Sequence, residues 1–227
     1  MAQCPFAIQM PISGTSGSYT AGPFRIIHHT TEGSTAQAAF DAFRSKRADP
    51  HFTVDATSIH QHVDTGTAAR ALVHILPQGE TNRLSAIQIE TVGFAGKHKS
   101  KKVLTNVARL LRWIEATHSI PRVWPNGPPK PPVAGGDPGG HNRNAANWVS
   151  QGGHYGHCHV PENTHWDPAY TEIETGFLMA AEFDAAGRLT NRDAAAVKAL
   201  LDRPDLPAFG GDEPVPMPDH FDVGDTP

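Results

Sequence analysis

The chain has 227 residues, of which 38% are hydrophobic and 19% are charged, and its formal net charge is −4. This length and composition are typical of a globular protein with one domain of catalytic size plus appendages, which argues against two equal domains. No run of 18 apolar residues occurs, so the sequence predicts no membrane span, and its two cysteines, Cys4 and Cys158, cannot form a disulfide framework.

The net charge conceals two parts of opposite sign. Residues 1–161 carry 15 Lys and Arg against 9 Asp and Glu, whereas residues 162–227 carry 4 against 14. A basic body suits an anionic polymer such as a cell wall or a nucleic acid. The one dense basic cluster consists of four lysines: Lys97, Lys99, Lys101 and Lys102. Because no aromatic residues are interleaved with them, we predict a solvated loop there and no nucleic-acid partner.

The first half of the chain predicts a strand, a helix and a hairpin. Residues 1–23 are expected to be an N-terminal extension, and they lack the basic and apolar regions of a signal peptide. Residues 24–28 then predict a short buried strand, and residues 34–47 a helix with Ser34 as N-cap. Two short alternating segments, 52–54 and 59–63, flank a turn and indicate a hairpin.

The middle of the chain contains the clearest elements. Residues 86–92 alternate in polarity and predict a strand whose polar face includes Glu90. Residues 101–117 have apolar side chains at helical spacing, and Pro121 prevents the helix from continuing. The segment that follows is so rich in Pro and Gly that it predicts a long surface loop beside the site, inserted within the domain.

The C-terminal part is expected to be an appendage. Residues 176–203 predict a helical segment, with a helix over residues 192–201, and residues 204–227 predict an acidic, disordered tail. The main domain is therefore expected over residues 24–175.

Residues 156–168, GHCHVPENTHWDP, are the most informative stretch of the sequence. Three histidines and an aspartate stand here in a run too irregular for a core element: His157, His159, His165 and Asp167. Such a run indicates half of a metal site. The best candidate for the other half is His28, which ends an apolar run and precedes His29.

A hydrolytic zinc site takes three protein ligands and leaves one position to water. His28, His157 and Asp167 would supply that set, with a doubling back of the chain between the last two. His159 and His154 are alternative ligands, whereas His29 is expected to be structural or to support a ligand. Cys158 is expected to be a small buried residue.

The sequence resembles the type 2 N-acetylmuramoyl-L-alanine amidases, a zinc-dependent family that includes the peptidoglycan-recognition proteins. Four pieces match in order over about residues 24–170: IIHHT at 26–30, HFTVD at 51–55, AIQIET at 86–91 and the GHCHVPENTHWDP stretch. The resemblance implies zinc ligands at His28, His157 and Asp167, and places the family's acidic catalytic residue, which positions or deprotonates the attacking water, at Glu90. The family's lysine two residues before the aspartate falls on His165, which departs from the pattern but can still donate a hydrogen bond to an oxyanion.

The resemblance implies a single α/β domain with a central mixed sheet flanked by helices. It also implies hydrolysis of the amide bond between N-acetylmuramic acid and L-alanine, with Zn²⁺ as cofactor and peptidoglycan or a soluble muropeptide as substrate. The alternatives are a non-catalytic peptidoglycan-binding module and a zinc amidohydrolase or peptidase acting on another amide. Glu90 has an alternative interpretation as a solvent-facing strand residue. We expect a protein that is cytoplasmic as made and reaches the wall by another export or lysis route.

Overall fold

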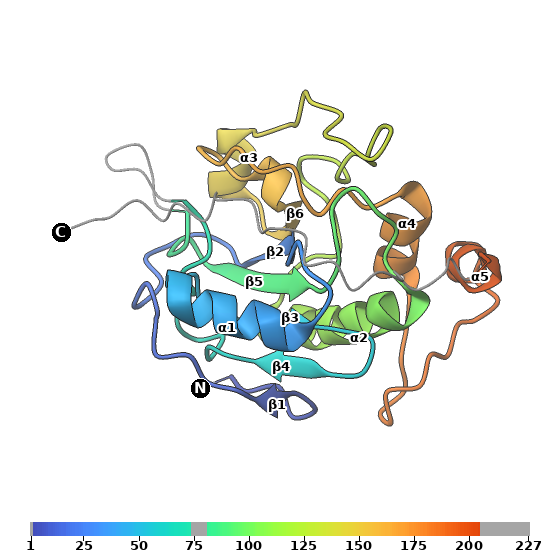
Figure 1. Cartoon of the computed structure of the whole chain (residues 1–227), viewed down its shortest axis with the longest axis horizontal. Coiled ribbons are helices and arrows are strands. Elements are labelled where there is room, and N and C mark those ends of the chain that lie inside the picture. Colours follow the sequence, from blue (N-terminus) through green and yellow to red (C-terminus); the bar gives the residue numbers. More distant parts are fainter. Residues whose placement is uncertain (1, 74–80, 205–227) are drawn as a thin grey trace.

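A computed structural model describes residues 2–73 and 81–204 of the chain. Its centre is a six-stranded sheet with the strand order β1-β4-β3-β5-β2-β6 (Figure 1). Neighbouring strands are parallel, except for the antiparallel pair of β3 and β4. The strands are β1 (Ile8–Gln9), β2 (Arg25–Thr30), β3 (Phe52–Val54), β4 (Ile59–Gln61), β5 (Ala86–Thr91) and β6 (Gly153–Gly156). The mixed α/β fold expected from the sequence is confirmed.

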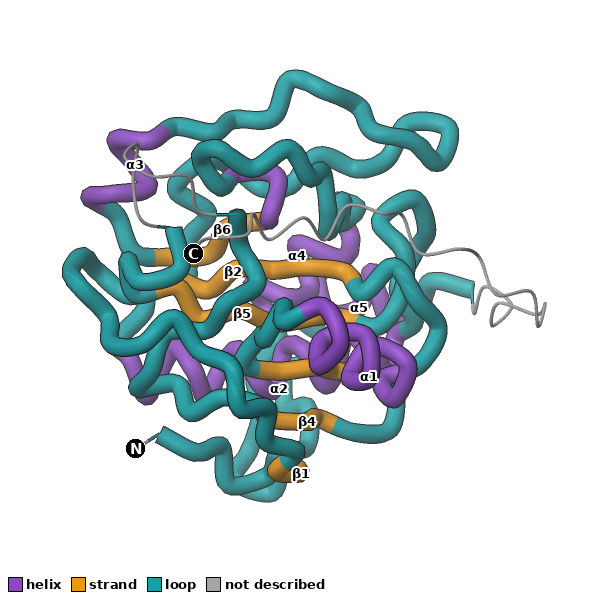
Figure 2. Tube along the Cα trace, turned by 60° about the vertical axis from the view of Figure 1, so that its left-hand side comes forward, coloured by secondary structure: helices purple, strands orange, loops and turns teal. Residues whose placement is uncertain are grey.

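Five α-helices and a short 3₁₀ turn surround the sheet in the described residues. They are α1 (Ala36–Lys46), α2 (Lys101–His118), α3 (Ala145–Ser150), α4 (Glu172–Ala180), α5 (Ala195–Asp202) and the 3₁₀ turn η1 (His157–His159). Figure 2, turned from the first view, shows the strands as one layer with α1 in front of it and α2 behind. None of these helices is long and apolar enough to cross a membrane.

The main hydrophobic core lies between the sheet and α2. Ile26, Ile87 and Ile89 point from the two central strands into this core and are fully buried. They meet the apolar stripe of α2, which has the helical spacing read from the sequence, and α4 and α5 close the far side. Each such side chain contributes about 1.5–3 kcal/mol by leaving water, so this layer holds the central strands in place.

Two smaller hydrophobic clusters pack on the opposite face of the sheet. Phe43 and Ala39 of α1 form one small cluster, and α1 also contacts β3. Trp148 of α3 belongs to a second cluster with Ile27 of β2. Because both clusters are small, polar side chains on this face of β2 and β5 can line a cavity near the carboxyl ends of the strands.

Most expected elements are present, with shifts at their ends. The hairpin, the strand over residues 86–92 and the helix over residues 101–117 are confirmed. The N-cap of α1 is Thr35 and not Ser34, because the Thr35 side chain accepts the Ala38 N–H. The sequence analysis missed α4, which begins with a capping box of Thr171 and Glu174.

Both ends of the described chain pack against the domain. Cys4 is buried in the main core, and β1 pairs with β4, so the segment expected as an N-terminal extension contributes a strand. At the other end α5 packs against α4. The expected disordered tail lies outside the described residues, apart from Pro204.

Candidate active site

His29, His157 and Asp167 come together at the carboxyl ends of β2 and β6. The His29 Nδ1 atom lies 3.1 Å from His157 Nδ1 and 3.9 Å from Asp167 Oδ2, and His157 Nδ1 lies 3.2 Å from Asp167 Oδ1. All three residues are buried. Among the described residues they are the one group of histidine, cysteine and carboxylate side chains whose ligand atoms could share a metal ion, with all three atoms within 4.8 Å of one another.

His28, which the sequence analysis placed among the ligands, points to the opposite face of the sheet. Its Nε2 atom lies 3.1 Å from His154 Nδ1, and its ring packs against Trp124 and Tyr170. Successive side chains of a strand alternate between the two faces, so His28 and His29 cannot both face His157. The structure therefore does not bring His28 to His157 and Asp167, as the sequence analysis expected, and His29 lies beside them instead.

The two alternative ligands also lie away from the cluster. His154 sits beside His28, and its Nε2 atom is 3.1 Å from Glu115 Oε1 of α2. His159 is buried and turns back, so that its Nδ1 atom accepts the Gly156 N–H at 3.1 Å. Neither residue belongs to the group around His29. Cys158 is fully buried, as expected.

Asn163 fixes the protonation of the His157 ring. Its Oδ1 atom accepts the Val73 N–H at 3.1 Å and lies 2.9 Å from His157 Nε2, while its Nδ2 group donates to two carbonyl oxygens. An amide oxygen can only accept, so His157 must carry its proton on Nε2. With its proton on Nε2, the ring can present a lone pair at Nδ1, toward His29 and Asp167. The sequence analysis did not identify Asn163.

Asp167 is held in its position from both sides. Its Oδ2 atom accepts the Thr30 N–H of β2 at 3.0 Å, and its backbone oxygen accepts the Cys158 N–H at 3.0 Å. Burial alone would raise the pKa of Asp167, but the nearby rings of His157, His29 and His165 outweigh burial and hold this pKa well below its usual range. A carboxylate that stays ionised is the form that a metal ligand requires.

Glu90 lies beside this group on the neighbouring strand. It pairs in register with His29, and its Oε1 atom is 4.0 Å from His29 Nδ1. It is buried, which corrects the interpretation of Glu90 as a solvent-facing residue. Burial, and then the negative charges of Asp167 and Glu32, raise its pKa well above the usual value. Its Oε2 atom has no hydrogen-bond partner among the described residues.

His165 forms one wall of the cavity. Its ring stacks on His157 with centroids 4.3 Å apart and an interplanar angle of 12°, and its Nδ1 atom is 3.7 Å from Asp167 Oδ1. The guanidinium of Arg143, at the end of the Pro/Gly-rich loop, donates to the His165 carbonyl oxygen at 2.8 Å. The loop predicted to lie beside the site therefore supports one of its walls.

A cavity of about 250 Å³ opens over these side chains. It is lined by His29, Thr30, Glu32, Glu90, Ala95, His157, Thr164, His165, Trp166 and Asp167. Four of the five expected site residues line it, and His28 does not. The cavity thus joins a possible metal site, a carboxyl group of raised pKa and a partly exposed tryptophan.

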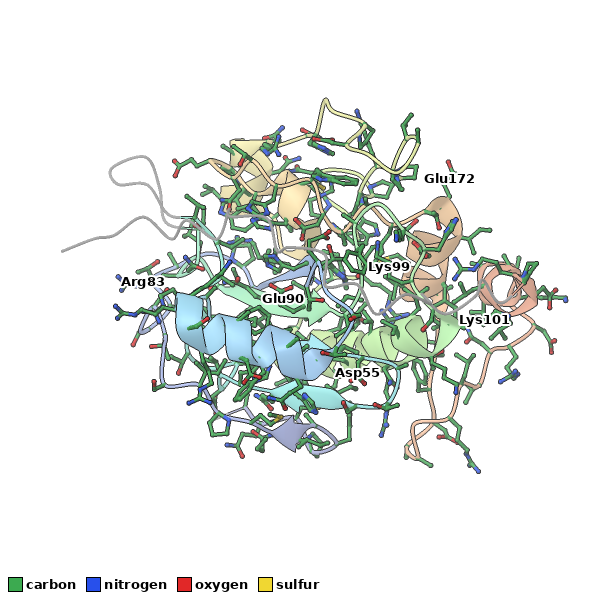
Figure 3. All side chains as sticks on the ribbon, viewed as in Figure 1. Asp55, Arg83, Glu90, Lys99, Lys101 and Glu172 are labelled. Carbon is green, nitrogen blue, oxygen red and sulfur yellow. The ribbon has the colours of Figure 1, made fainter. Side chains whose placement is uncertain are left out.

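Lys99 lies next to the site and is buried. The expectation that this lysine belongs to a solvated loop is therefore wrong. Its ammonium group donates to the Pro168 carbonyl oxygen at 2.7 Å, directly after Asp167 in the chain. Burial lowers the pKa of Lys99 to about 8, against the opposing effect of Glu174, Glu32 and Asp167. Figure 3 labels Lys99 in the loop before α2 and Glu90 on β5.

The donor set fits a zinc ion. Two imidazole nitrogens and one ionised carboxylate are the ligands of a common class of catalytic zinc site, which leaves one position open. The lone pair at His157 Nδ1 faces His29 Nδ1 and the Asp167 carboxylate, so three atoms of types that ligate metal ions meet at one point. A cation is the group that such an arrangement would stabilise.

The family profile described as N-acetylmuramoyl-L-alanine amidase matches residues 20–170, which is well over half of the chain. This match contains every residue of the site. The chain belongs to the N-acetylmuramoyl-L-alanine amidase family. The amidase therefore hydrolyses the amide bond between N-acetylmuramic acid and L-alanine in peptidoglycan.

Several solved structures are similar to the amidase in part. The Staphylococcus aureus hydrolase AmiA, solved in complex with its ligand, is 17% identical, with 73% of this chain and 74% of that chain covered and a TM-score of 0.49. AmpD is 14% identical, with 78% and 96% covered and a TM-score of 0.49. LysC from Clostridium intestinale is 17% identical, with 52% and 79% covered and a TM-score of 0.40. No curated protein sequence matches the chain.

Proposed function

We propose that the amidase cleaves its substrate with a zinc ion held by His29 Nδ1, His157 Nδ1 and the Asp167 carboxylate, and with Glu90 as the proton-transfer group. The convergence of these three ligand groups within 4.8 Å, beside a buried carboxyl group, supports this proposal most directly. When bound, zinc supplies a Lewis acid that polarises a carbonyl group and lowers the pKa of water.

Glu90 is suited to move a proton during hydrolysis. The pKa of its carboxyl group is raised toward neutral pH. A group with such a pKa can accept a proton as a general base and then return it. In this scheme Glu90 takes one proton from the attacking water while a C–O bond forms at the lactyl carbonyl carbon. It then gives the proton to the nitrogen of L-alanine as the C–N bond breaks.

His165 is placed to stabilise the oxygen on which negative charge develops. Its ring forms the cavity wall next to His157 and Asp167, and it is partly exposed to the cavity. A hydrogen bond to that oxygen would strengthen as the charge develops. Trp166, also on the cavity wall, offers an apolar surface for the sugar or peptide near the scissile bond.

The decisive test is release of stem peptide from purified peptidoglycan. The amidase is assayed as isolated, after chelation and after zinc is restored, with products identified by mass and bound zinc counted. We expect one zinc ion per chain and cleavage between muramic acid and L-alanine that is lost and regained with zinc. Cleavage that persists in metal-free protein would refute the zinc role, and cleavage of another amide alone would refute the substrate assignment.

A further inference from the structure

A second cavity lies on the molecule at the other end of α1. It has a volume of about 730 Å³ and is lined by Pro11, Ile12, Ser13, Gly14, Thr15, Phe40, Arg44, Arg47, Asp49 and Arg70. None of these residues belongs to the catalytic cavity. The N-terminal end of α1 follows Thr30 and Glu32, which line the catalytic cavity, whereas Arg44 and Arg47 stand at its C-terminal end.

The second cavity carries unbalanced positive charge. Arg70 is paired with the buried Asp49 carboxylate, with its Nε atom 2.9 Å from Asp49 Oδ2. Arg44 and Arg47 are exposed, and within the described ranges neither has a carboxylate at ion-pair distance. The Arg44 guanidinium lies over the Phe40 ring, 5.6 Å from its centroid, and this contact leaves its N–H groups able to bind an anion, as are those of Arg47. Arg70 lines the same cavity but is already paired with Asp49.

The loop opposite the arginines adds neutral donors. Gly14 packs directly on the Asp49 and Arg70 pair, where a Cβ atom would overlap both side chains. This close approach brings the backbone of the loop to the cavity wall. Ser13, Gly14 and Thr15 donate their backbone N–H groups to no acceptor among residues 2–73 and 81–204. Arginine forks and free N–H groups together are the donors that bind carboxylate and phosphate oxygens best.

The distance between the two cavities suits a polymer. With 11 residues at 1.5 Å per residue, α1 is about 16 Å long. About five residues of extended peptide cover this length. A polymeric substrate bound at the catalytic cavity can therefore extend along α1 and place a charged group between the arginines.

We propose that Arg44, Arg47 and Arg70 form a second binding site that takes an oxyanion group, a carboxylate or a phosphate, of the wall polymer. This inference rests on the proposed function for the identity of the polymer. The site would retain long substrates and would have no effect on the chemical step. Short substrates that end before the C-terminal end of α1 would not reach it.

The test compares R44Q/R47Q with the matched control R188Q/R192Q, which removes two exposed arginines and the same charge from another surface. Substrates are purified peptidoglycan and a soluble N-acetylmuramoyl-L-alanine peptide with a short stem. For R44Q/R47Q we expect kcat/KM on the polymer to fall about tenfold or more, because charged hydrogen bonds to the substrate are lost. The fall should come from a higher KM, with kcat unchanged. Turnover of the short substrate and the unfolding midpoint should be unchanged, and the control should match the unaltered protein throughout.

Further arms distinguish the two sources of the oxyanion. Walls stripped of phosphate polymers test the phosphate source, and walls with amidated stem-peptide carboxylates test the carboxylate source. One of the two treatments should abolish the difference between R44Q/R47Q and the unaltered protein. R44K/R47K, which keeps the charge without the planar fork, should recover part of the lost affinity.

Two outcomes would overturn the inference: equal losses in R44Q/R47Q and in the control, which would indicate bulk charge, or equal losses on the short and the polymeric substrate. Failure of the unaltered protein to cleave the short substrate would instead contradict the proposed function. Binding of each variant to intact walls, measured with the E90Q substitution added to each, then still decides whether the second site exists.

Discussion

His28 and His29 are neighbours in β2, yet the first bonds to His154 under α2 and the second meets His157 in the catalytic cavity. The strand therefore serves two purposes at one point. On one face it helps to build a buried polar row that continues from His154 to Glu115, and on the other it carries a possible metal ligand. Substitutions at these two adjacent positions should consequently have different effects.

His29→Ala should lose zinc and activity together, because one of three ligands is removed. We expect zinc affinity to fall by more than about 100-fold, measured by competition with a chromophoric chelator. His28→Ala should keep one bound zinc ion. Its main effect should be a loss of about 1–3 kcal/mol in the free energy of unfolding, because it leaves the buried Nδ1 atom of His154 without its partner. Zinc loss in His28→Ala with zinc retained in His29→Ala would reverse our assignment.

Glu90→Gln should keep the metal site and lose turnover. Glutamine has nearly the same shape, but it cannot accept and return a proton, so we expect kcat to fall by about 10²–10⁴-fold with one zinc ion still bound. The measurement is stem-peptide release alongside metal content and substrate binding. A variant that retains a tenth or more of the turnover would show that another group transfers the proton.

Asn163→Ala should weaken zinc binding although Asn163 is not itself a proposed ligand. The Asn163 oxygen accepts from His157 Nε2 and so keeps the lone pair on Nδ1, the proposed ligand atom. Loss of such a partner typically lowers metal affinity by about 10- to 100-fold. Asn163→Asp is the matched control, since it keeps the acceptor and should retain most of the affinity. Equal losses in both variants would mean that the Val73 contacts, and not the ring orientation, are what matters.

The sequence predicts the elements of the site better than it predicts their orientation. The motif from Gly156 to Pro168 identifies His157 and Asp167, since their chemistry is visible in the residue types. Which of two adjacent histidines faces them depends on the phase of the strand, and this phase is set by the packing of Ile26 and Ile89 under α2. A buried strand has apolar residues on both faces, so its sequence does not alternate between polar and apolar residues. The face to which each side chain points therefore cannot be predicted from the sequence of such a strand.

Supporting residues are harder still to predict. Asn163 looks like an ordinary turn residue in a polar segment, and its role depends on a backbone contact with Val73, which is 90 residues away. Lys99 belongs to a lysine-rich stretch typical of a solvated loop, but the fold buries its ammonium group against the Pro168 carbonyl oxygen. Only long-range packing distinguishes such residues from their exposed neighbours.

The last described helix should matter for activity although it lies beyond the matched family segment. Arg203, the C-cap residue of α5, donates to the buried Glu174 carboxylate at 3.1 Å and to the Lys99 carbonyl oxygen at 2.5 Å. Glu174 also accepts the Lys99 N–H at 2.8 Å. This network holds the lysine that supports the chain after Asp167.

Arg203→Met should therefore lower both stability and turnover. It leaves a buried carboxylate without its cation, for which about 3–5 kcal/mol of unfolding free energy is the usual cost. The double variant Arg203→Met with Glu174→Gln removes the unpaired charge and should recover part of this loss. The measurements are urea unfolding and kcat at a temperature where both variants are folded. A fully stable and active Arg203→Met would show that α5 has no influence on the site.

Stability should fall in mildly acidic solution because two buried histidines resist protonation. Gln88 N–H donates to His51 Nδ1 at 2.9 Å, and His62 Nδ1 is 2.8 Å from the Met10 carbonyl oxygen, with Thr53 Oγ1 at 2.8 Å from Nε2. Burial lowers the pKa of each ring from 6.5 to about 4. Between these two pH values the unfolded chain binds protons that the native chain does not.

The stabilisation from His62 should thus be complete above about pH 6.5 and decline as the pH falls toward 4, by about 2 kcal/mol at pH 5. His62→Gln should make the free energy of unfolding depend less on pH by this amount, whatever its effect at pH 7.5. Urea unfolding of metal-free protein at pH 7.5, 6 and 5 measures this difference without interference from metal release. His98→Gln, at a half-exposed position, is the control. If both variants show the pH slope of the unaltered protein, protonation of His62 does not contribute to acid unfolding.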